Sequence, residues 1–297
     1  AFGGTVGVVA VDRLHGGSKK GVFRVRLTDG SSVVLYVWTE HENWWSTVGS
    51  GDTGIFADAS GLDLFTSAYE RLNALGVPVP ELFAPDHDAA LLQDLPGPSL
   101  EDLLDADPDP EPILVRLRES LRRMRSATRS GCGKVGLPAI AEPFHDAVLE
   151  RAVRHVDSAS GREPRIAAVR DRLRDALRTA AAPIRPRNDY TLVHGELGPD
   201  HVRVDADGRP VLIDIEGLMW ADVEWEHVFL ELRFGAHYET LRDPDLDADR
   251  MRFYRLAMHL SLVEGPLRLL ETDFPDAEVM RSIADYNLGR VLALIEA

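Results

Sequence analysis

One short stretch of this sequence constrains the chain more than any other. Residues 192–217 read LVHGELGPDHVRVDADGRPVLIDIEG, in which two apolar runs flank an AspAlaAspGly turn, a pattern typical of a β-hairpin. A structural hairpin needs only alternation and a turn, yet this one also gathers groups that hold a proton or a metal. These groups are His194, Glu196, Asp200, His201, Asp214 and Glu216. We therefore interpret the segment as a catalytic element.

The composition limits the class of partner. The formal net charge of -16 argues against a nucleic-acid partner, because phosphate neutralisation needs clustered Lys and Arg. An acidic surface is more often a solubility device, although it also suits a cationic small molecule. The single Cys132 permits no internal disulfide, and no apolar run approaches the roughly 18 residues of a membrane span. We expect a cytoplasmic protein without membrane contact, either a monomer or a homodimer.

The first third of the chain predicts a small antiparallel sheet. Residues 5–13, 22–28 and 32–38 are rich in β-branched and aromatic residues, and ThrAspGlySer forms the turn between the last two. A helix is expected over 62–75 and a further strand over 89–95, followed by ProGlyProSer, which is typical of a linker. These features divide the chain into a β-rich lobe, residues 1–94, and a helical lobe, residues 95–297.

Helical periodicity dominates the second lobe. Ser99 and Asp102 have the spacing of a capping box. Apolar residues recur at helical spacing from Ile113 to Met124, and again from Ile166 to Leu177 in what the pattern predicts to be one Arg-rich surface helix. A small antiparallel sheet, a hinge and a helical lobe with an acidic hairpin predict an α+β, bilobal protein-kinase-like fold.

The motifs in this layout resemble those of the aminoglycoside phosphotransferase family, also called the choline-kinase-like group. Its members carry HisGlyAsp, three variable residues and Asn in a catalytic loop, and then a strand ending in IleAsp. Here the stretches read HisGlyGluLeuGlyProAspHis and ValLeuIleAspIleGluGly, with GlyValProValPro and LeuProGlyProSerLeuGluAspLeuLeu earlier and Asp222 and Glu226 later. The resemblance implies transfer of phosphate from ATP or GTP, with Mg²⁺ or alternatively Mn²⁺, to a hydroxyl of an aminoglycoside-like antibiotic or another metabolite.

The resemblance also implies roles for single residues. Glu196 takes the position of the catalytic base, and His194 belongs to the same loop, where we expect it to act mainly as a brace. Asp214 takes the position of the main metal ligand, with His201 as a second; Glu216, two residues along an expected strand, faces the same side as Asp214. The hinge residues Gln93, Asp94 and Leu95 are expected to contact the nucleotide. The acceptor candidates are Asp200, Glu224 and Glu264.

Three positions depart from the family pattern. Glu196 replaces Asp and moves the carboxylate by one methylene, and errors of ~1 Å cost about a hundredfold in rate. His201 replaces Asn, and imidazole suits Mn²⁺ or Zn²⁺ better than Mg²⁺. Tyr36 occupies the strand position of the lysine that holds the nucleotide phosphates, and its helical Glu partner is missing near Asp63 and Phe65.

A glycine-rich turn offers a replacement for the missing lysine. The chain has only three lysines, and two of them lie in HisGlyGlySerLysLysGly, residues 15–21. Backbone amides and lysines in such turns bind phosphate, although the turn is equally compatible with an ordinary flexible hairpin. The expected nucleotide-binding residues are Gly16, Gly17, Ser18, Lys19 and Lys20.

Two other functions remain open. A catalytically impaired member of this fold would bind a nucleotide or metabolite without transferring phosphate. The missing strand lysine favours that alternative, whereas the acids at positions 196, 214 and 216 oppose it. A metal-dependent hydrolase would use His194, His201, Asp214 and Glu216, but the sequence offers no wider cluster of ligands.

Overall fold

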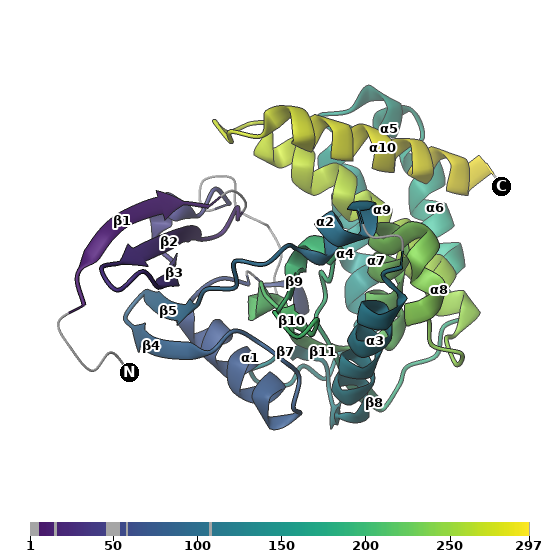
Figure 1. Cartoon of the computed structure of the whole chain (residues 1–297). Coiled ribbons are helices and arrows are strands. Elements are labelled where there is room, and N and C mark those ends of the chain that lie inside the picture. Colours follow the sequence, from purple (N-terminus) through teal and green to yellow (C-terminus); the bar gives the residue numbers. More distant parts are fainter. Residues whose placement is uncertain (1–5, 15–16, 46–53, 58, 107–108, 297) are drawn as a thin grey trace.

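The protein is described by a computed structural model that covers residues 6–14, 17–45, 54–57, 59–106 and 109–296. It has two regions, a sheet with one helix and a larger helical region, joined by the segment after β5 (Figure 1). The α+β arrangement expected from the sequence is confirmed. In the described part of the chain, no helix combines the length and the apolar character that crossing a bilayer requires.

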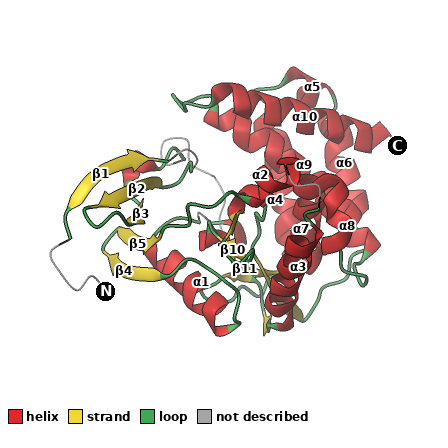
Figure 2. Ribbon diagram, in the orientation of Figure 1, coloured by secondary structure: helices red, strands yellow, loops and turns green. Residues whose placement is uncertain are grey.

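The N-terminal region is a five-stranded antiparallel sheet (Figure 2). Its strands, in spatial order, are β1 (Val8–Arg13), β2 (Gly21–Leu27), β3 (Ser32–Val37), β5 (Ala89–Gln93) and β4 (Leu82–Asp86). The expected meander of the first three strands and the expected strand at β5 are confirmed. Strand β4, which contains Pro85, was not expected from the sequence. A proline is tolerated there because β4 is an edge strand and the missing N–H breaks no ladder.

One face of the sheet packs on α1 (Leu62–Ala74). Tyr36 and Trp38 are two residues apart along an extended segment, so both side chains point to the same face. The ring of Phe65, in α1, lies 5.9 Å from the ring of Tyr36 and 5.4 Å from that of Trp38. This aromatic cluster lies next to the glycine-rich turn and supports it.

The C-terminal region is built from helices (Figure 1). They are α2 (Leu100–Ala106), α3 (Glu111–Ser126), α4 (Phe144–Ser160), α5 (Pro164–Ala168), α6 (Arg170–Ala181), α7 (Val223–Phe234), α8 (Tyr238–Leu241), α9 (Ala248–Leu269) and α10 (Ala277–Glu296). The long helix α9 packs against α4, α6, α7 and α10 and is the centre of this region. The expected capping box forms at the start of α2, where Ser99 N–H donates to Asp102 Oδ2 at 2.9 Å and Asp102 N–H donates to Ser99 Oγ at 3.1 Å.

The prediction of one helix through Ile166 and Leu177 is wrong. The chain turns at Val169, with φ −120° and ψ 15°, and so separates α5 from α6. Ile166, Leu173 and Leu177 are nevertheless completely buried. Periodicity could not reveal the break because both short helices pack on α4 and keep their apolar residues on that side.

Two small sheets hold the hairpin that the sequence singles out. In the first, the strands are ordered β6 (Thr128–Ser130), β8 (Asp189–Val193), β11 (Met219–Ala221) and β7 (Gly133–Lys134). In the second, β9 (Val202–Val204) pairs with β10 (Pro210–Leu212). Ile213 N–H donates to His201 O at 3.0 Å, which brings the segment after β10 beside the segment before β9.

Candidate active site

The loop after β8 is braced from inside the helical region. His194 is completely buried, and its Nε2–H donates to Ile213 O at 3.0 Å. Burial lowers the pKa of His194 to about 4, so the ring is neutral at pH 7. The expected bracing role fits this geometry, because the bond ties the loop to the residue before Asp214.

A second brace comes from α7. Glu226 is 3% exposed, and its Oε2 accepts a hydrogen bond from Gly195 N–H at 2.8 Å. Burial outweighs the bonds from the backbone N–H groups and raises the pKa of Glu226 to about 7. The only sequence signal for this residue is its place downstream in the family pattern, which by itself assigns no role.

Glu196 is the loop residue that faces the sheet. It is open to solvent at a cavity of about 70 Å³ that lies between the glycine-rich turn and the carboxylates of Asp214 and Glu216. The surrounding protein removes part of its hydration and so opposes its charge, but the ammonium of Lys19, together with other nearby cationic groups, lowers the pKa of Glu196 below its ordinary value. Glu196 is therefore ionised at neutral pH, as an acceptor for a hydroxyl proton must be.

Asp214 and Glu216 converge, but not along a strand as expected. β10 ends at Leu212, Asp214 has left-handed backbone angles (φ 59°, ψ 47°), and Ile215–Gly217 is a 3₁₀ turn. Such angles are uncommon for a residue with a side chain and cluster at functional sites. The expectation of a strand is therefore wrong, and the tight turn rather than a two-residue period directs both carboxylates to the same place.

Lys20 lies between these two carboxylates. Its Nζ donates to Asp214 Oδ1 and, at 2.6 Å, to Glu216 Oε1. The side chain is buried, and the two carboxylates outweigh the effect of burial and raise the pKa of Lys20. The Nζ is also 4.8 Å from the ring centroid of Tyr36, the residue at the expected lysine position. The ammonium of Lys20, which comes from the turn before β2, therefore lies beside Tyr36, the β3 position at which the family pattern has a lysine.

His201 connects the catalytic loop to Asp214. Its Nδ1–H donates to Glu196 O at 2.7 Å, while its Nε2 lies 3.5 Å from Asp214 Oδ2 and 3.6 Å from Asp200 Oδ2. Burial disfavours the charged ring, but the two carboxylates outweigh it and raise the pKa of His201. Asp200 also pairs with Arg233 at 2.9 Å. Both His201 and Asp200 therefore lie at the site.

A tryptophan side chain, that of Trp45, contacts the glycine-rich turn. Gly17 has φ +86°, and a Cβ there would lie 2.9 Å from Lys20 O, so the turn requires glycine. Trp45 Nε1–H donates to Ser18 Oγ at 2.8 Å, and the Trp45 ring lies under the guanidinium of Arg268 in α9. The turn that carries Lys20 is thereby linked to the helical region. Gly16, the remaining predicted residue of this turn, lies outside the described residues.

A comparison with protein families decides what kind of chain this is. Residues 24–262 match the model of the phosphotransferase enzyme family. The chain belongs to the phosphotransferase enzyme family. Among curated proteins the sequence has no significant match.

Solved structures of small-molecule kinases share the fold of this phosphotransferase-family chain. A thermostable mutant of aminoglycoside phosphotransferase APH(4)-Ia superposes with a TM-score of 0.70 at 19% identity, over 97% of this chain and 94% of that one. Choline kinase LicA from Streptococcus pneumoniae gives 0.65 at 14% identity, over 97% and 94%. Plasmodium vivax ethanolamine kinase gives 0.60 at 9% identity, over 94% and 81%. The bilobal protein-kinase-like fold is confirmed, and the family match indicates a phosphotransferase.

The carboxylates of this phosphotransferase-family chain suit Mg²⁺ that is also held by phosphate oxygens. Glu216 Oε2 is buried without a hydrogen-bond partner among the described residues, so it has an oxygen available for a cation. No group of three or more His, Cys, Asp and Glu side chains stands ready to hold a metal in the described ranges. Mg²⁺ commonly takes one or two carboxylates plus substrate phosphates and water, whereas a catalytic zinc site needs about three protein ligands. Asp214 and Glu216 therefore fit Mg²⁺.

The predicted hinge residues are engaged in bonds of their own. Asp94 accepts hydrogen bonds from Arg24, with Nε at 2.7 Å. The side chain of Gln93 accepts a backbone N–H, and Leu95 O accepts from Arg203 at 3.0 Å. A nucleotide contact by these residues stays a prediction, and at Leu95 it would have to share the carbonyl with Arg203.

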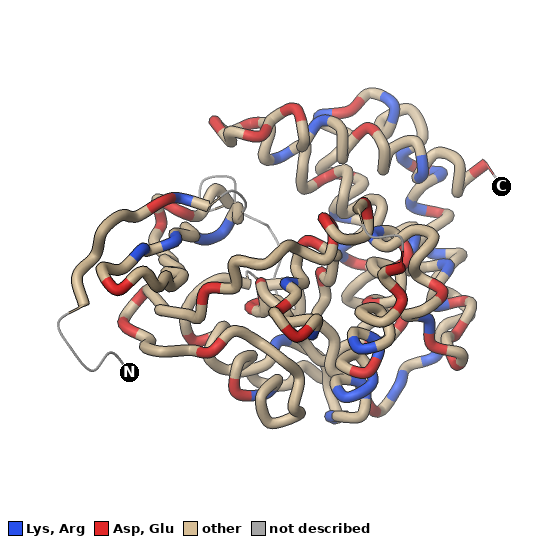
Figure 3. Tube along the Cα trace, in the orientation of Figure 1, with Lys and Arg blue, Asp and Glu red and all other residues tan. Residues whose placement is uncertain are grey.

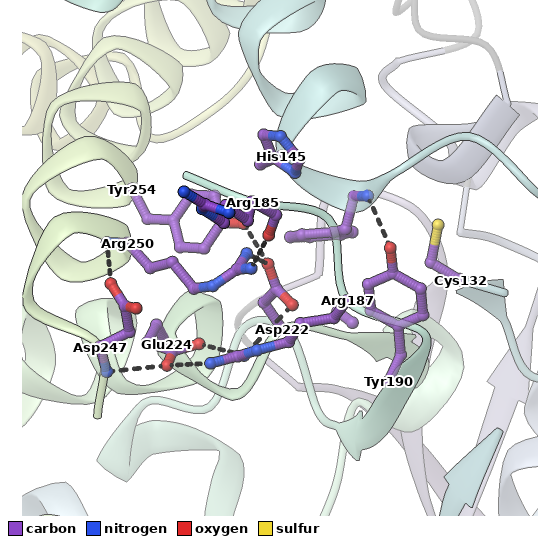
Figure 4. Close-up of polar contacts among 12 residues, drawn as sticks. Cys132, His145, Arg185, Arg187, Tyr190, Asp222, Glu224, Asp247, Arg250 and Tyr254 are labelled. Atoms are coloured by element: carbon purple, nitrogen blue, oxygen red, sulfur yellow. Dashed lines mark hydrogen bonds and ion pairs between the residues drawn. The ribbon is translucent and has the colours of Figure 1, made fainter. Parts of the chain in front are cut away.

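Two of the predicted acceptor residues are buried in the helical region. Both oxygens of Glu224 accept hydrogen bonds from Arg187, at 2.6 and 2.7 Å, beside the ion pair of Asp222 and Arg250 (Figure 4). Glu264 is 3% exposed and accepts a hydrogen bond from a serine hydroxyl at 2.8 Å. An acceptor role for either side chain stays a prediction, although both carboxylates already accept hydrogen bonds from the protein. Neither enters the acceptor site proposed below.

Proposed function

We propose that the chain transfers the terminal phosphoryl group of ATP or GTP to a hydroxyl of a small-molecule acceptor, with Mg²⁺ as cofactor. The observation that carries the proposal is the convergence of Glu196, Asp214, Glu216 and Lys20 on one cavity. Phosphoryl transfer depends on a group that orients the nucleophile and on cations that neutralise the phosphates. The four side chains supply the carboxylate for the nucleophile, two metal ligands and one fixed cation.

In this mechanism Glu196 accepts the proton of the acceptor hydroxyl. The hydroxyl oxygen bonds to the γ-phosphorus while the bond from that phosphorus to its bridging oxygen breaks, and the nucleoside diphosphate leaves. Asp214 and Glu216 hold Mg²⁺, with His201 beside them. The bound ion supplies neutralising charge to the phosphates. The proton on Glu196 then returns to solvent.

Nucleotide binding in this mechanism requires Lys20 to move. The cavity of about 70 Å³ is far smaller than the roughly 300–1,000 Å³ of small-molecule sites, so the cleft has to widen. We infer that Lys20 exchanges the oxygens of Asp214 and Glu216 for phosphate oxygens, which would leave the two carboxylates available to hold Mg²⁺. Lys20 thus performs the task of the lysine expected at Tyr36.

The acidic side chain of Asp200 favours a cationic acceptor. Asp200 Oδ2 lies 3.6 Å from His201 Nε2, so the Asp200 carboxylate is at the edge of the catalytic loop. A solved complex of APH(4)-Ia contains ADP and hygromycin B, and LicA is named a choline kinase. Hygromycin B, other aminoglycosides and choline therefore come first in an acceptor screen; an aminoglycoside substrate would make the protein an antibiotic-resistance enzyme.

The test is mass-spectrometric detection of phosphorylated acceptor after incubation with ATP or GTP and Mg²⁺. We expect product from the parent and at least ~100-fold less from Glu196→Gln, which lacks the proton acceptor but keeps the metal ligands. Nucleotide binding measured by calorimetry should be unchanged in that variant.

One alternative has a specific observation in its favour. Lys20 already neutralises Asp214 and Glu216, as it would in a catalytically impaired protein that binds nucleotide without transfer. Metal-dependent nucleotide binding with no product from any acceptor would support that alternative. Absence of nucleotide binding would contradict both.

A further inference from the structure

A second cavity lies within the helical region. It has a volume of about 410 Å³ and is bounded by α3, β8, the first turn of α7 and the segment between α8 and α9. It shares no lining residue with the cavity at Lys20. Its size falls in the range of roughly 300–1,000 Å³ that small-molecule sites occupy.

The walls of this cavity carry more arginine than acid. Arg118, Arg122 and Arg125 from α3 and Arg242 after α8 line it, against the carboxylates of two aspartates and Glu226, whose pKa of about 7 leaves it only partly ionised at neutral pH. Figure 3 shows how basic positions recur along α3. The chain as a whole has a net charge of -16, so this cluster of guanidinium groups is opposite in sign to the charge of the protein. Guanidinium groups are the preferred partners of phosphate and carboxylate.

Some of this arginine charge is available to a ligand. Arg125 pairs with Asp243, and Arg118 donates to a backbone carbonyl at 3.2 Å. Arg122 is exposed and makes no ion pair with any residue that the structure describes. The cavity also has an apolar side, which includes Leu121 and Leu192. Its walls therefore match a molecule with an anionic end and an apolar body.

The cavity touches the residues that hold the catalytic loop. Val193, which precedes His194, and Glu226 both line it. Glu226 holds Gly195 N–H through Oε2, and its Oε1 is buried with no hydrogen-bond partner among the described residues. A molecule in the cavity would contact this brace directly.

We propose that the cavity is a second small-molecule site, which binds an organic phosphate with an apolar body and acts on the catalytic loop through Val193 and Glu226. Occupation changes the affinity of the catalytic cavity for nucleotide, and nucleotide changes the affinity of the second site by the same factor. The binding claim is independent of the proposed phosphoryl transfer.

The first experiment uses phenyl phosphate as probe and calorimetry on the full chain. We expect saturable binding with a dissociation constant near ~1 mM, weakened about tenfold or more in Arg118→Gln/Arg122→Gln. Arg281→Gln, an exposed arginine outside the cavity, should bind like the parent, and so should Lys19→Ala in the catalytic cavity. Benzoate and inorganic phosphate show whether the anionic end or the apolar body dominates: a preference for the ester over both supports the proposal.

Several results would overturn the proposal. If phenyl phosphate shows no saturable binding at millimolar concentration, the cavity is not a binding site for organic phosphates. Binding that is lost in Lys19→Ala and kept in Arg118→Gln/Arg122→Gln places the probe in the catalytic cavity instead. If inorganic phosphate binds as tightly as phenyl phosphate, the apolar wall does not contribute to binding. An unchanged dissociation constant for Mg²⁺-ADP in the presence of saturating phenyl phosphate contradicts the link to the catalytic loop.

Discussion

The two halves of the candidate site are held in different ways. On the helical side, neutral His194 and partly ionised Glu226 fix the loop by hydrogen bonds inside the core. On the sheet side, Lys20 is held by charged hydrogen bonds to Asp214 and Glu216, two ion pairs that join the two regions of the molecule. The helical side departs from the family pattern at Glu196 and His201 but keeps a carboxylate at position 196, whereas the sheet side has lost the lysine at Tyr36. The comparison teaches that a cation can reach the carboxylates from the turn before β2, beside Tyr36, where the family pattern has a lysine on the strand itself.

The largest expected effect comes from Asp214→Asn, which removes a charge that both halves share. We expect phosphoryl transfer to fall by more than ~100-fold, since even residues that only support metal ligands are worth 10–100-fold. Mg²⁺ should no longer strengthen nucleotide binding in calorimetry with and without EDTA. Asp207→Asn, an exposed aspartate of the same hairpin, serves as the control. A variant that keeps its Mg²⁺ dependence would show that Asp214 is not the ligand.

The second prediction sharpens the contrast between the glycine-rich turn, which carries Lys20, and β3, which carries Tyr36. Lys20→Met should weaken binding of Mg²⁺-ADP by about 10–100-fold, because a hydrogen bond to a charged group contributes ~1.5–3 kcal/mol. Lys20→Met/Tyr36→Lys should recover part of that loss, since Tyr36 lies beside the Lys20 ammonium on β3. Calorimetry gives both affinities. The variants also need a thermal unfolding check, because Glu216 loses a buried partner.

If Lys20→Met/Tyr36→Lys binds Mg²⁺-ADP no better than Lys20→Met, the result would contradict the proposal that Lys20 does the work of a lysine at position 36. If Lys20→Met alone binds like the parent, the clamp comes from elsewhere in the turn, and Lys19→Met is the next variant to compare.

The third prediction concerns the helical brace. The pKa of Glu226 is about 7 in the folded protein against an ordinary 4.5, so between these values the native state keeps a proton that the unfolded chain has lost. Raising the pH through this window therefore lowers the free energy of unfolding by about 3 kcal/mol for this group. Glu226→Gln lacks the proton, so the difference between parent and variant should change by about 3 kcal/mol from pH 5 to pH 8 in urea unfolding. Parallel pH profiles would mean that Glu226 is already ionised at pH 5.

The smallest expected effect is that of His201→Asn, which restores the residue of the family pattern. Imidazole favours Mn²⁺ relative to an amide oxygen, so the variant should shift its preference toward Mg²⁺, by less than about tenfold. The measurement is the ratio of activities with the two ions at equal free concentration. A shift toward Mn²⁺ would place His201 outside the metal site.

The sequence was informative wherever the signal is local. The alternation in β2 and β3, the capping box at Ser99 and the hairpin around β9 and β10 all depend on neighbours within a few residues. The roles expected of the acids in the catalytic loop came from the resemblance of this short segment to the family motif. These features could be predicted because short segments determine them.

The remaining features depend on contacts between distant segments. Lys20 and Asp214 are 194 residues apart, and no periodicity links them. The left-handed angles of Asp214 arise from the turn that follows β10, whereas its sequence reads as a continuing strand. Glu226 reaches the catalytic loop from a different helix, α7. Each of these is fixed by tertiary packing, which local patterns do not encode.

The central claim, that Lys20 is the displaced phosphate-binding cation, can be observed directly. The chain has three lysines, so labelling with ¹⁵N-lysine gives few Nζ signals, and the signal absent from Lys20→Arg identifies Lys20. Its buried, ion-paired ammonium should exchange slowly and be visible without nucleotide. The account predicts that Mg²⁺-ADP changes this signal as the ammonium moves from Asp214 and Glu216 to the phosphates. A Lys20 signal that stays the same at saturating nucleotide would contradict the claim.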